Sequence, residues 1–490
     1  MVSSVTEASH KRRWLDSTPA RCLAAAVTFT GIGIYEAIHL TALTDKDIWW
    51  HLRTGLWILE NHAIPRAALF SQASSATWID SSWGFDLLTS AAYRSFGLGG
   101  LPVLLLLLQV AMAVALFRLA RTISSGFWLA VVLSALAQVC LFPSQLRPGL
   151  CSIVFFAAEL TLLFRTRHTG RARSLLWLPP IFLLWVNLDR EFTYGLITLA
   201  LFCIAILGQQ GFGREKFSGG MPYGALGAAA GGSLLATFVS PYGYHLPRLL
   251  WQSAMNSAAD RYFRELHAMR FRQPQDYIIL LLTMTAFFVL GRRRSRDFFL
   301  YALLICSAAV SFRLQRDTWL VVAVSVAVIA DTLRANEGKK STAESRMGNP
   351  EIPALAIVAL AIVGLYRVPA QVCMSKVSEN FPMRACDYIR QKHLPQPLFN
   401  TYQWGGFLTW YLPEYPVSID GRTDLYGDEI NIAYFKLVQA EIPLQSYAAF
   451  AQAKTMLLES NSALTQGLRM LPDFRVDYAD DQATVIVRAN

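Results

Sequence analysis

Residues 101–117 read LPVLLLLLQVAMAVALF, a run of 17 residues without a charged side chain. A helix of this length and composition is just long enough to cross the hydrocarbon core of a bilayer. Similar apolar stretches recur along the chain, so we predict an α-helical polytopic membrane protein with about eleven transmembrane helices. The predicted spans are residues 22–43, 101–117, 127–142, 150–164, 174–188, 192–208, 222–240, 275–290, 298–312, 318–330 and 352–366.

The composition of the whole chain agrees with this prediction. Of its 490 residues, 54% are hydrophobic and only 16% are charged, whereas a soluble globular protein carries about 25% charged residues. The aromatic content of 12% excludes a disordered chain, because it supplies ample surface to bury. The seven cysteines form no CxxC pair, which argues against a zinc ribbon or an iron–sulfur site.

The basic residues predict the orientation of the chain. With the N-terminus in the cytoplasm, lysine and arginine are about twice as dense in the predicted inner segments as in the outer loops, as the positive-inside rule requires. Topology therefore accounts for the net charge of +10, and no nucleic-acid partner is needed.

We divide the chain into three parts. Residues 1–21 form a cytoplasmic N-terminal segment, residues 22–366 a multispan transmembrane domain, and residues 367–490 a domain outside the membrane. The transmembrane domain contains two long outer loops, residues 44–100 and 241–274. The run from Trp83 to Phe96 in the first loop is too short and too polar for a span, so we predict a juxtamembrane helix there.

The C-terminal part differs from the rest of the chain in having no long apolar run. Residues 416–420 and 483–489 have the composition of strands, and residues 379–392 and 446–470 that of helices. We therefore predict a small soluble α/β domain, and an odd number of spans puts it outside. Cys373 and Cys386 either pair there or remain thiols.

The most unusual local sequence is TDKDIWWHL, residues 44–52, directly after the first predicted span. Its two carboxylates and its histidine, Asp45, Asp47 and His51, have the chemistry to position a cation or to act as a base. The alternative is a solvated helix end, because aspartate favours a helix N-terminus and tryptophan favours the membrane interface. The residues alone leave both readings open.

The same motif resembles the GT-C superfamily of membrane glycosyltransferases, which have an acidic pair after the first span and a C-terminal domain outside. Residues 45–52, with Gly55, Trp57 and Pro65, resemble in particular a bacterial group of multispan proteins related to protein O-mannosyltransferases and aminoarabinose transferases. Residues 399–407 and 419–424 resemble the same group. The resemblance implies a sugar transfer from a polyprenyl-phosphate-linked donor at the outer face of the bacterial inner membrane.

The resemblance also implies roles for the residues of the motif. Asp47 is the first choice for the catalytic base or for a metal ligand, and Asp45 is the second. His51, one helical turn beyond Asp47, would hydrogen-bond Asp47 or the acceptor, with Trp50 beside it. The superfamily varies in its use of metal, so a divalent Mg²⁺ or Mn²⁺ ion at Asp45 and Asp47 and a metal-free base both stay open.

Charged residues at the predicted outer ends of spans are the candidates for binding the donor phosphate. Ionisable residues at membrane depth are functional candidates by default, although snorkelling or a structural ion pair explains each of them equally well. The members of this set are Arg147, Arg190, Glu191, Arg313 and Arg316. Related proteins tend to have His-Gly at the position of Asp189-Arg190.

The C-terminal domain contributes a further predicted set, Trp404, Asp420 and Arg422, in two loop-rich runs with turn glycines. These runs faintly resemble the acceptor-reading motif of oligosaccharyltransferases, and a strand–turn role explains them as well.

The leading hypothesis is therefore a lipid-phospho-sugar-dependent glycosyltransferase acting on a glycan, lipid or protein acceptor. The alternative is a transporter or flippase, or a non-catalytic assembly subunit, for lipid-linked glycans. Transporters usually hold polar sites at the bilayer midplane and have repeated halves. The predicted polar residues instead gather at one membrane face, and no internal repeat is evident.

Overall fold

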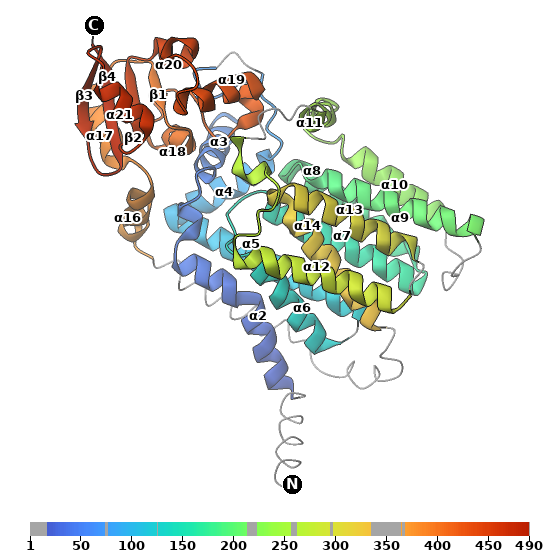
Figure 1. Ribbon diagram of the computed structural model, residues 1–490. Helices are drawn as coiled ribbons and strands as arrows, with labels where there is room; N and C mark the ends of the chain where they lie inside the picture. The colour runs from blue at the N-terminus through green and yellow to red at the C-terminus, as the bar shows by residue number, and fades with distance from the viewer. Residues whose placement is uncertain are drawn as a thin grey trace.

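The computed structural model describes residues 17–73, 77–124, 126–212, 223–255, 262–294, 297–334, 364 and 368–489. Figure 1 shows a bundle of helices with a small β-sheet beyond one of its ends. Two helices, α3 (Ile48–Asn61) and α4 (Trp83–Phe96), lie between the bundle and the sheet. The architecture is therefore mostly helical, with strands confined to the C-terminal residues in the described part of the chain.

The bundle contains ten helices that coincide with ten of the predicted spans. They are α2 (Thr18–Ile38), α5 (Gly100–Ser124), α6 (Phe127–Cys140), α7 (Gly149–Thr169), α8 (Leu178–Leu188), α9 (Phe192–Phe212), α10 (Tyr223–Ala236), α12 (Pro274–Arg292), α13 (Phe298–Arg313) and α14 (Thr318–Arg334). The predicted span 352–366 lies almost wholly outside the described residues.

Four helical stretches among the described residues are both long and apolar enough to cross a bilayer. They are Thr18–Ile38, Trp83–Ser124, Gly149–Thr169 and Pro274–Arg292, and four shorter apolar helices accompany them. Within Trp83–Ser124, a positive φ at Gly97 separates α4 from α5. The long apolar part is α5, and the predicted helix from Trp83 to Phe96 is confirmed as α4, a separate helix of 14 residues.

The first helix ends earlier than the predicted span 22–43. α2 stops at Ile38, because Leu40 takes a left-handed conformation, and a short 3₁₀ turn at Thr41–Leu43 follows. Asp47 then precedes α3, which packs along α4. Gly55 permits this close approach, since a Cβ there would collide with the carbonyl oxygen of Asp86 on α4.

The C-terminal residues form a four-stranded mixed sheet of order β1-β2-β4-β3. Its strands are β1 (Leu398–Asn400), β2 (Thr455–Glu459), β3 (Phe474–Ala479) and β4 (Ala483–Arg488), and only β1 and β2 pair in parallel. The surrounding helices are α16 (Ala370–Asn380), α17 (Met383–Lys392), α18 (Tyr402–Tyr411), α19 (Thr423–Val438), α20 (Ala448–Gln452) and α21 (Ala463–Arg469). Cys373 and Cys386 are buried, unpaired thiols.

Two local predictions for this region were wrong. The predicted helix 446–470 is interrupted by β2, whose apolar residues fill the centre of the sheet between β1 and β4. Residues 416–420 are not a strand of the sheet, although Val417 forms an isolated bridge with Ser71 of the first outer loop. The predicted strand at 483–489 is confirmed as β4.

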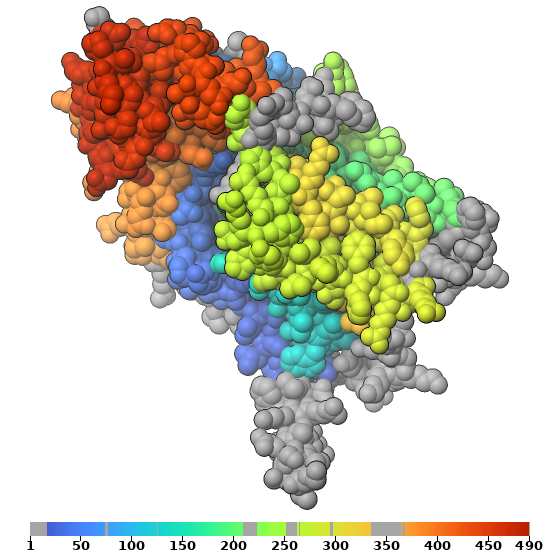
Figure 2. All heavy atoms as spheres, viewed as in Figure 1, coloured from blue at the N-terminus to red at the C-terminus, as the bar shows by residue number. Residues whose placement is uncertain are grey.

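The C-terminal residues share a hydrophobic core with the outer helices. Trp49 at the start of α3 is fully buried, and its ring lies 5.6 Å from those of Phe381 and Phe407 and 4.7 Å from that of Trp410. Figure 2 shows the C-terminal residues seated on one end of the molecule. This shared core fixes the sheet and its loops relative to the bundle.

Candidate active site

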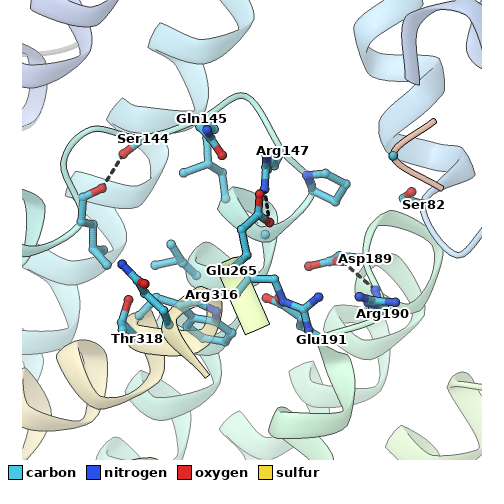
Figure 3. Close-up of a pocket in the computed structure, with 18 of the residues that line it drawn as sticks. Ser82, Ser144, Gln145, Arg147, Asp189, Arg190, Glu191, Glu265, Arg316 and Thr318 are labelled. Carbon is cyan, nitrogen blue, oxygen red and sulfur yellow. Dashed lines mark hydrogen bonds and ion pairs between the residues drawn. The ribbon is translucent and has the colours of Figure 1, made fainter. Parts of the chain in front are cut away.

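A cavity of about 840 Å³ opens where the bundle, the outer helices and the C-terminal residues meet. Its wall is built from α3, the loop between α6 and α7, the turn between α8 and α9, the turn before α14, and residues 421–424. Figure 3 shows the polar side chains that gather around it, among them Arg147, Glu191, Glu265 and Arg316. Charged groups from distant parts of the sequence therefore meet at one place.

Arg147 is the centre of the first charged group, and it joins the acidic pair of the TDKDIWWHL motif. Its Nε lies 2.9 Å from Asp45 Oδ2, and its Nη2 lies 3.1 Å from Asp47 Oδ2. Its Nη1 lies 2.7 Å from Glu265 Oε2. Three carboxylates thus hold one guanidinium, which itself lines the cavity.

Of the two alternatives left open by the sequence, a divalent metal at Asp45 and Asp47 or a metal-free base, this arrangement does not fit the metal. The Arg147 guanidinium already occupies the position between the two carboxylates that a cation would take. The described residues also contain no group of three or more His, Cys, Asp or Glu side chains arranged to hold a metal ion. Arginine supplies the positive charge at this point of the site.

Asp47 itself is partly covered by the C-terminal residues. Its Oδ1 is buried without a hydrogen-bond partner, and a Cβ on Gly421 would collide with this oxygen. Burial raises the pKa of Asp47 to about 6, although Arg147 and Lys46 oppose the shift. Asp47 is absent from the residues that line the cavity, and Arg147 stands in that wall.

His51 lines the cavity one turn beyond Asp47, and a second acidic pair lies behind it. Its Nδ1 is 2.6 Å from Asp86 Oδ1, and both side chains are buried. Asp80 lies near Asp86, and burial raises the pKa of both carboxyls. Burial, followed by the charges of Arg147 and Arg422, lowers the pKa of His51, so its imidazole is neutral at pH 7. Trp50 stacks on His51, with ring centroids 3.6 Å apart.

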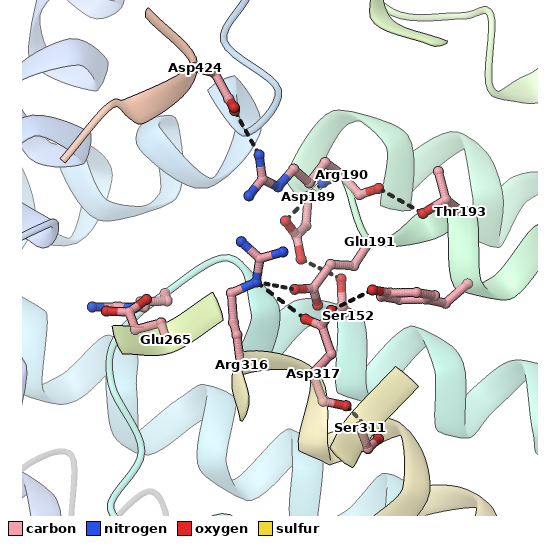
Figure 4. Close-up of polar contacts among 12 residues, drawn as sticks. Ser152, Asp189, Arg190, Glu191, Thr193, Glu265, Ser311, Arg316, Asp317 and Asp424 are labelled. Carbon is pink, nitrogen blue, oxygen red and sulfur yellow. Dashed lines mark hydrogen bonds and ion pairs between the residues drawn. The ribbon is translucent and has the colours of Figure 1, made fainter. Parts of the chain in front are cut away.

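A second charged group centres on Arg316. Its Nε lies 3.2 Å from Asp317 Oδ1 and 3.9 Å from Glu191 Oε1, as Figure 4 shows. Asp317 also accepts a short hydrogen bond from Tyr194. The two terminal amino groups of Arg316 have no partner among the described residues, and Arg316 lines the cavity.

The turn before α9 contributes the neighbouring charges. Arg190 Nη1 lies 2.6 Å from Asp424 Oδ2, so this pair links the bundle to the C-terminal residues. Asp189 accepts a hydrogen bond of 2.5 Å from Ser152. Burial, then the neighbouring charges of Asp189 and Asp317, raises the pKa of Glu191, whose Oε2 is buried and unpartnered.

The fold can be compared with solved structures. ArnT from Cupriavidus metallidurans bound to undecaprenyl phosphate matches with a TM-score of 0.50 and 11% sequence identity, over 94% of this chain and 97% of that chain. The chain has the fold of ArnT. The apo state of the same ArnT gives a TM-score of 0.45 and 12% identity over the same shares of both chains. No protein-family model matches the chain, and no curated protein is similar to it in sequence.

The ArnT match confirms the predicted GT-C resemblance at the level of the fold. The chain shares the architecture of ArnT, and four of its described helical stretches are long and apolar enough to cross a membrane. At 11% identity the match concerns the fold alone, so the roles of individual residues depend on the geometry described above.

The structure brings together most of the predicted site residues. Those that line the cavity are Trp50, His51, Arg147, Arg190, Glu191, Arg316 and Arg422, and Asp45 and Asp47 contact the cavity-lining Arg147. Arg313 is exposed at the end of α13 and does not line the cavity. Trp404 and Asp420 are buried away from it, and Asp420 holds Arg422 at 2.6 Å.

Sequence reasoning missed Asp80, Asp86 and Glu265. All three lie in the two long outer loops, where no motif or regular spacing distinguishes them from solvated acids. Their roles arise from contacts made across the fold, such as the 35-residue separation between His51 and Asp86. A helical reading of residues 83–96 places Asp86 in the first turn, which is an ordinary position for an aspartate.

Proposed function

We propose that this protein transfers a sugar from a polyprenyl-phosphate-linked donor to an acceptor at the outer face of a bacterial inner membrane. The observation that carries the proposal is the cavity of about 840 Å³, with two arginine–carboxylate groups in its wall, in a chain that has the fold of ArnT. The ArnT structure was solved with undecaprenyl phosphate bound, which supports a polyprenyl phosphate as the ligand of this chain.

Arg316 is our candidate for the group that holds the donor phosphate. Both of its terminal amino groups are without partners in the described part of the chain, and the planar guanidinium fork suits two phosphate oxygens. Arg190 lies in the same wall, and its side chain has Asp424 as its one partner among the described residues, which leaves further N–H groups for a ligand. Two arginines would stabilise the negative charge that develops on the phosphate as the sugar leaves.

Arg147 differs from these two because three carboxylates already bind it. We assign Asp45 and Asp47 the task of fixing Arg147, and we assign the whole group the task of shaping the part of the cavity next to His51. Glu265, the member of this carboxylate group that lines the cavity, also provides negative charge for the positive, oxocarbenium-like sugar carbon of a glycosyl-transfer transition state.

The arrangement of charges favours an enzyme over the alternative of a transporter. The polar wall combines outer loops, helix ends and C-terminal residues at one end of the bundle, whereas transporter sites lie at the bilayer midplane in interrupted helices. The C-terminal residues supply Arg422, Thr423 and Asp424 to the wall, so the sheet and its loops complete the cavity.

Two measurements test the proposal. Native mass spectrometry of the purified protein should detect a co-purifying polyprenyl phosphate or its sugar conjugate. Vesicles that contain the protein, bacterial lipid extract and a set of undecaprenyl-phosphate hexoses and pentoses should release undecaprenyl phosphate from at least one donor. If no lipid is bound and no donor in the set is cleaved, the proposal is wrong.

A further inference from the structure

His51 and Asp86 form a buried pair whose geometry resembles that of a catalytic dyad. Their hydrogen bond joins Nδ1 of the imidazole to Oδ1 of the carboxyl at 2.6 Å. Asp86 is fully buried on α4, and its second oxygen has no hydrogen-bond partner. Asp80 Oδ2 is buried and unpartnered as well, and burial raises the pKa of both of these adjacent carboxyls.

This pair selects one tautomer of the imidazole. When Asp86 is ionised, its Oδ1 can only accept from Nδ1. The ring proton then lies on Nδ1, and Nε2 carries a lone pair. Nε2 has no hydrogen-bond partner among the described residues and retains some contact with solvent. The His51 side chain lines the cavity. A neutral imidazole with a free Nε2 is a proton acceptor.

The other candidate base, Asp47, is poorly placed for this task. Its Oδ2 lies on Arg147 at 3.1 Å. Its Oδ1 is buried beneath Gly421 without access to the cavity. Both oxygens are therefore engaged or covered, whereas His51 presents an unused lone pair.

We propose that the acceptor is a neutral, hydroxyl-bearing molecule, and that His51 is the catalytic residue that takes the proton from its hydroxyl while Asp86 positions the imidazole. This inference rests on the proposed function and adds to it the chemical class of the acceptor. In the step, the acceptor oxygen forms a bond to C1 of the sugar, and its proton moves to His51 Nε2. The bond between C1 and the phosphate oxygen breaks, and its electron pair leaves with the polyprenyl phosphate.

The charges around His51 favour a hydroxyl over a phosphate as the nucleophile. The two cations whose charges act on His51, Arg147 and Arg422, are already bound by carboxylates, and the Asp80–Asp86 pair lies behind the imidazole. A phosphate monoester brings its own negative charge into these surroundings, and it requires no base because it is already deprotonated. A hydroxyl enters without charge and needs a base.

The first test is independent of any substrate. Diethyl pyrocarbonate acylates unprotonated imidazole nitrogens, and peptide mass spectrometry locates the modified histidine. His51 should be modified at pH 7, and prior loading with undecaprenyl phosphate should slow the reaction. The exposed His62 at the end of α3 serves as the internal standard. Modification of His62 with His51 untouched would overturn the inference.

The second test compares His51→Asn with His62→Asn on a donor that the wild type cleaves. Asparagine keeps an N–H donor for Asp86 and removes Nε2, so kcat should fall about 10²-fold with donor KM unchanged. The charged groups that act on His51 are Asp86, which is hydrogen-bonded to Nδ1, and Arg147 and Arg422, while Asp80 adjoins Asp86. In the wild type, kcat should fall with decreasing pH below about pH 6.5, as His51 becomes protonated. This fall should be absent in His51→Asn, and His62→Asn should have the pH profile of the wild type. If His51→Asn had the kcat of the wild type and the same fall in rate at low pH, His51 would not be the base. The proposed sugar transfer would still stand.

Asp86→Asn tests the positioning role separately. The amide still fills the space, but its nitrogen competes for contact with Nδ1 and weakens the selection of the tautomer. We expect a lower kcat at an unchanged donor KM. A change in donor KM at constant kcat would show that Asp86 serves donor binding instead.

The acceptor class is tested with two probes of equal chain length, octyl glucoside and octyl phosphate, below micellar concentration. Release of polyprenyl phosphate without either probe measures transfer to water, the smallest hydroxyl acceptor. Octyl glucoside should accelerate the release of polyprenyl phosphate by the wild type and not by His51→Asn. If octyl glucoside is not an acceptor, the slower release that results from transfer to water should likewise be lost in His51→Asn. Acceleration by octyl phosphate that survives His51→Asn would overturn the hydroxyl class. If the wild type cleaves no donor at all, the proposed function fails, and the diethyl pyrocarbonate result still decides whether Nε2 is available.

Discussion

At the scale of single residues, the two arginine groups of the cavity differ in what they leave free. Arg147 uses Nε, Nη1 and Nη2 on three carboxylates. Arg316 uses only Nε on Asp317 and Glu191. A guanidinium that binds a ligand phosphate needs two adjacent N–H groups on one edge. That requirement assigns phosphate binding to Arg316 and a structural task to Arg147.

The prediction for Arg316 uses Arg313 as its matched control. Arg316→Lys replaces the fork by a point charge, so donor KM should rise about tenfold at a modest change in kcat. Arg313→Lys should leave both constants unchanged, because Arg313 is exposed and does not line the cavity. Steady-state kinetics of the two variants, with melting temperatures to confirm folding, make the comparison. Equal donor KM in Arg316→Lys and wild type would remove Arg316 from the phosphate site.

Asp47 leads to a prediction about stability and pH. Its pKa in the folded protein is raised to about 6 from the ordinary 3.8, so the native state binds the proton more tightly than the unfolded chain. The stability that this proton provides is complete below about pH 4 and is lost as the pH rises through about 6. Asp47→Asn does not titrate, and its amide oxygen can still accept from Arg147. Relative to the wild type, the variant should gain melting temperature between about pH 4 and pH 7. A difference that stays constant, or that shrinks, would contradict the raised pKa.

The residue scale also shows how far the sequence could lead. From the charge, the aromatic residues and the position of TDKDIWWHL we predicted Asp45, Asp47 and His51 as site residues. The structure places His51 in the wall of the cavity and both aspartates against Arg147, and their part in catalysis stays a prediction. These features were insufficient to predict that one oxygen of Asp47 is engaged and the other covered. That depends on Gly421 and Arg147, which lie 374 and 100 positions further along the chain.

At the scale of elements, the N-terminus of α3 is held by the loop before α19. Gly421 packs against Asp47, and Gly406 of α18 packs against the carbonyl of Lys46. No side chain beyond hydrogen fits at either glycine without displacing the backbone or the carboxylate. The loop and the helix N-terminus are therefore fitted to one another.

Gly421→Ala tests this fit. The added methyl group would collide with Asp47 Oδ1, so the loop or the carboxylate must shift, at a cost of about 1–3 kcal/mol typical of overpacking. Donor turnover should fall together with the melting temperature. Gly467→Ala in α21 is the matched control, since a Cβ there meets nothing within 4 Å and alanine is the better helix former. A Gly421→Ala protein as stable as Gly467→Ala would contradict the close packing.

The sequence predicted the long helices of the bundle better than the short elements of the C-terminal part. The long apolar runs located ten bundle helices, because a span must be apolar over its whole length. The short C-terminal elements were harder, and β2 was mistaken for part of a helix. Its TMLLE sequence is a short apolar run that fits either structure, and only pairing with β1 and β4 makes it a strand.

At the scale of the whole molecule, the C-terminal residues complete one part of the cavity wall, residues 421–424. The shared core around Trp49 and the Arg190–Asp424 ion pair are two independent ties between the C-terminal residues and the rest of the chain. The cavity therefore faces the side of the membrane on which the C-terminal residues lie. That side is predicted from the distribution of basic residues alone.

Cysteine labelling in intact cells tests the orientation. In a background without the seven native cysteines, Ser446→Cys should react with a membrane-impermeant maleimide, because Ser446 is exposed in the C-terminal region, which we place outside. Ser174→Cys should react only after the cells are permeabilised, since the basic segment 165–173 before it is predicted to be cytoplasmic. A third position, Ser341, lies outside the described residues and should behave like Ser174 if residues 331–351 are an inner linker. Labelling of Ser174→Cys in intact cells together with protection of Ser446→Cys would show that the protein has the opposite orientation in the membrane. The cavity would then face the cytoplasm, and the donor would have to be presented there.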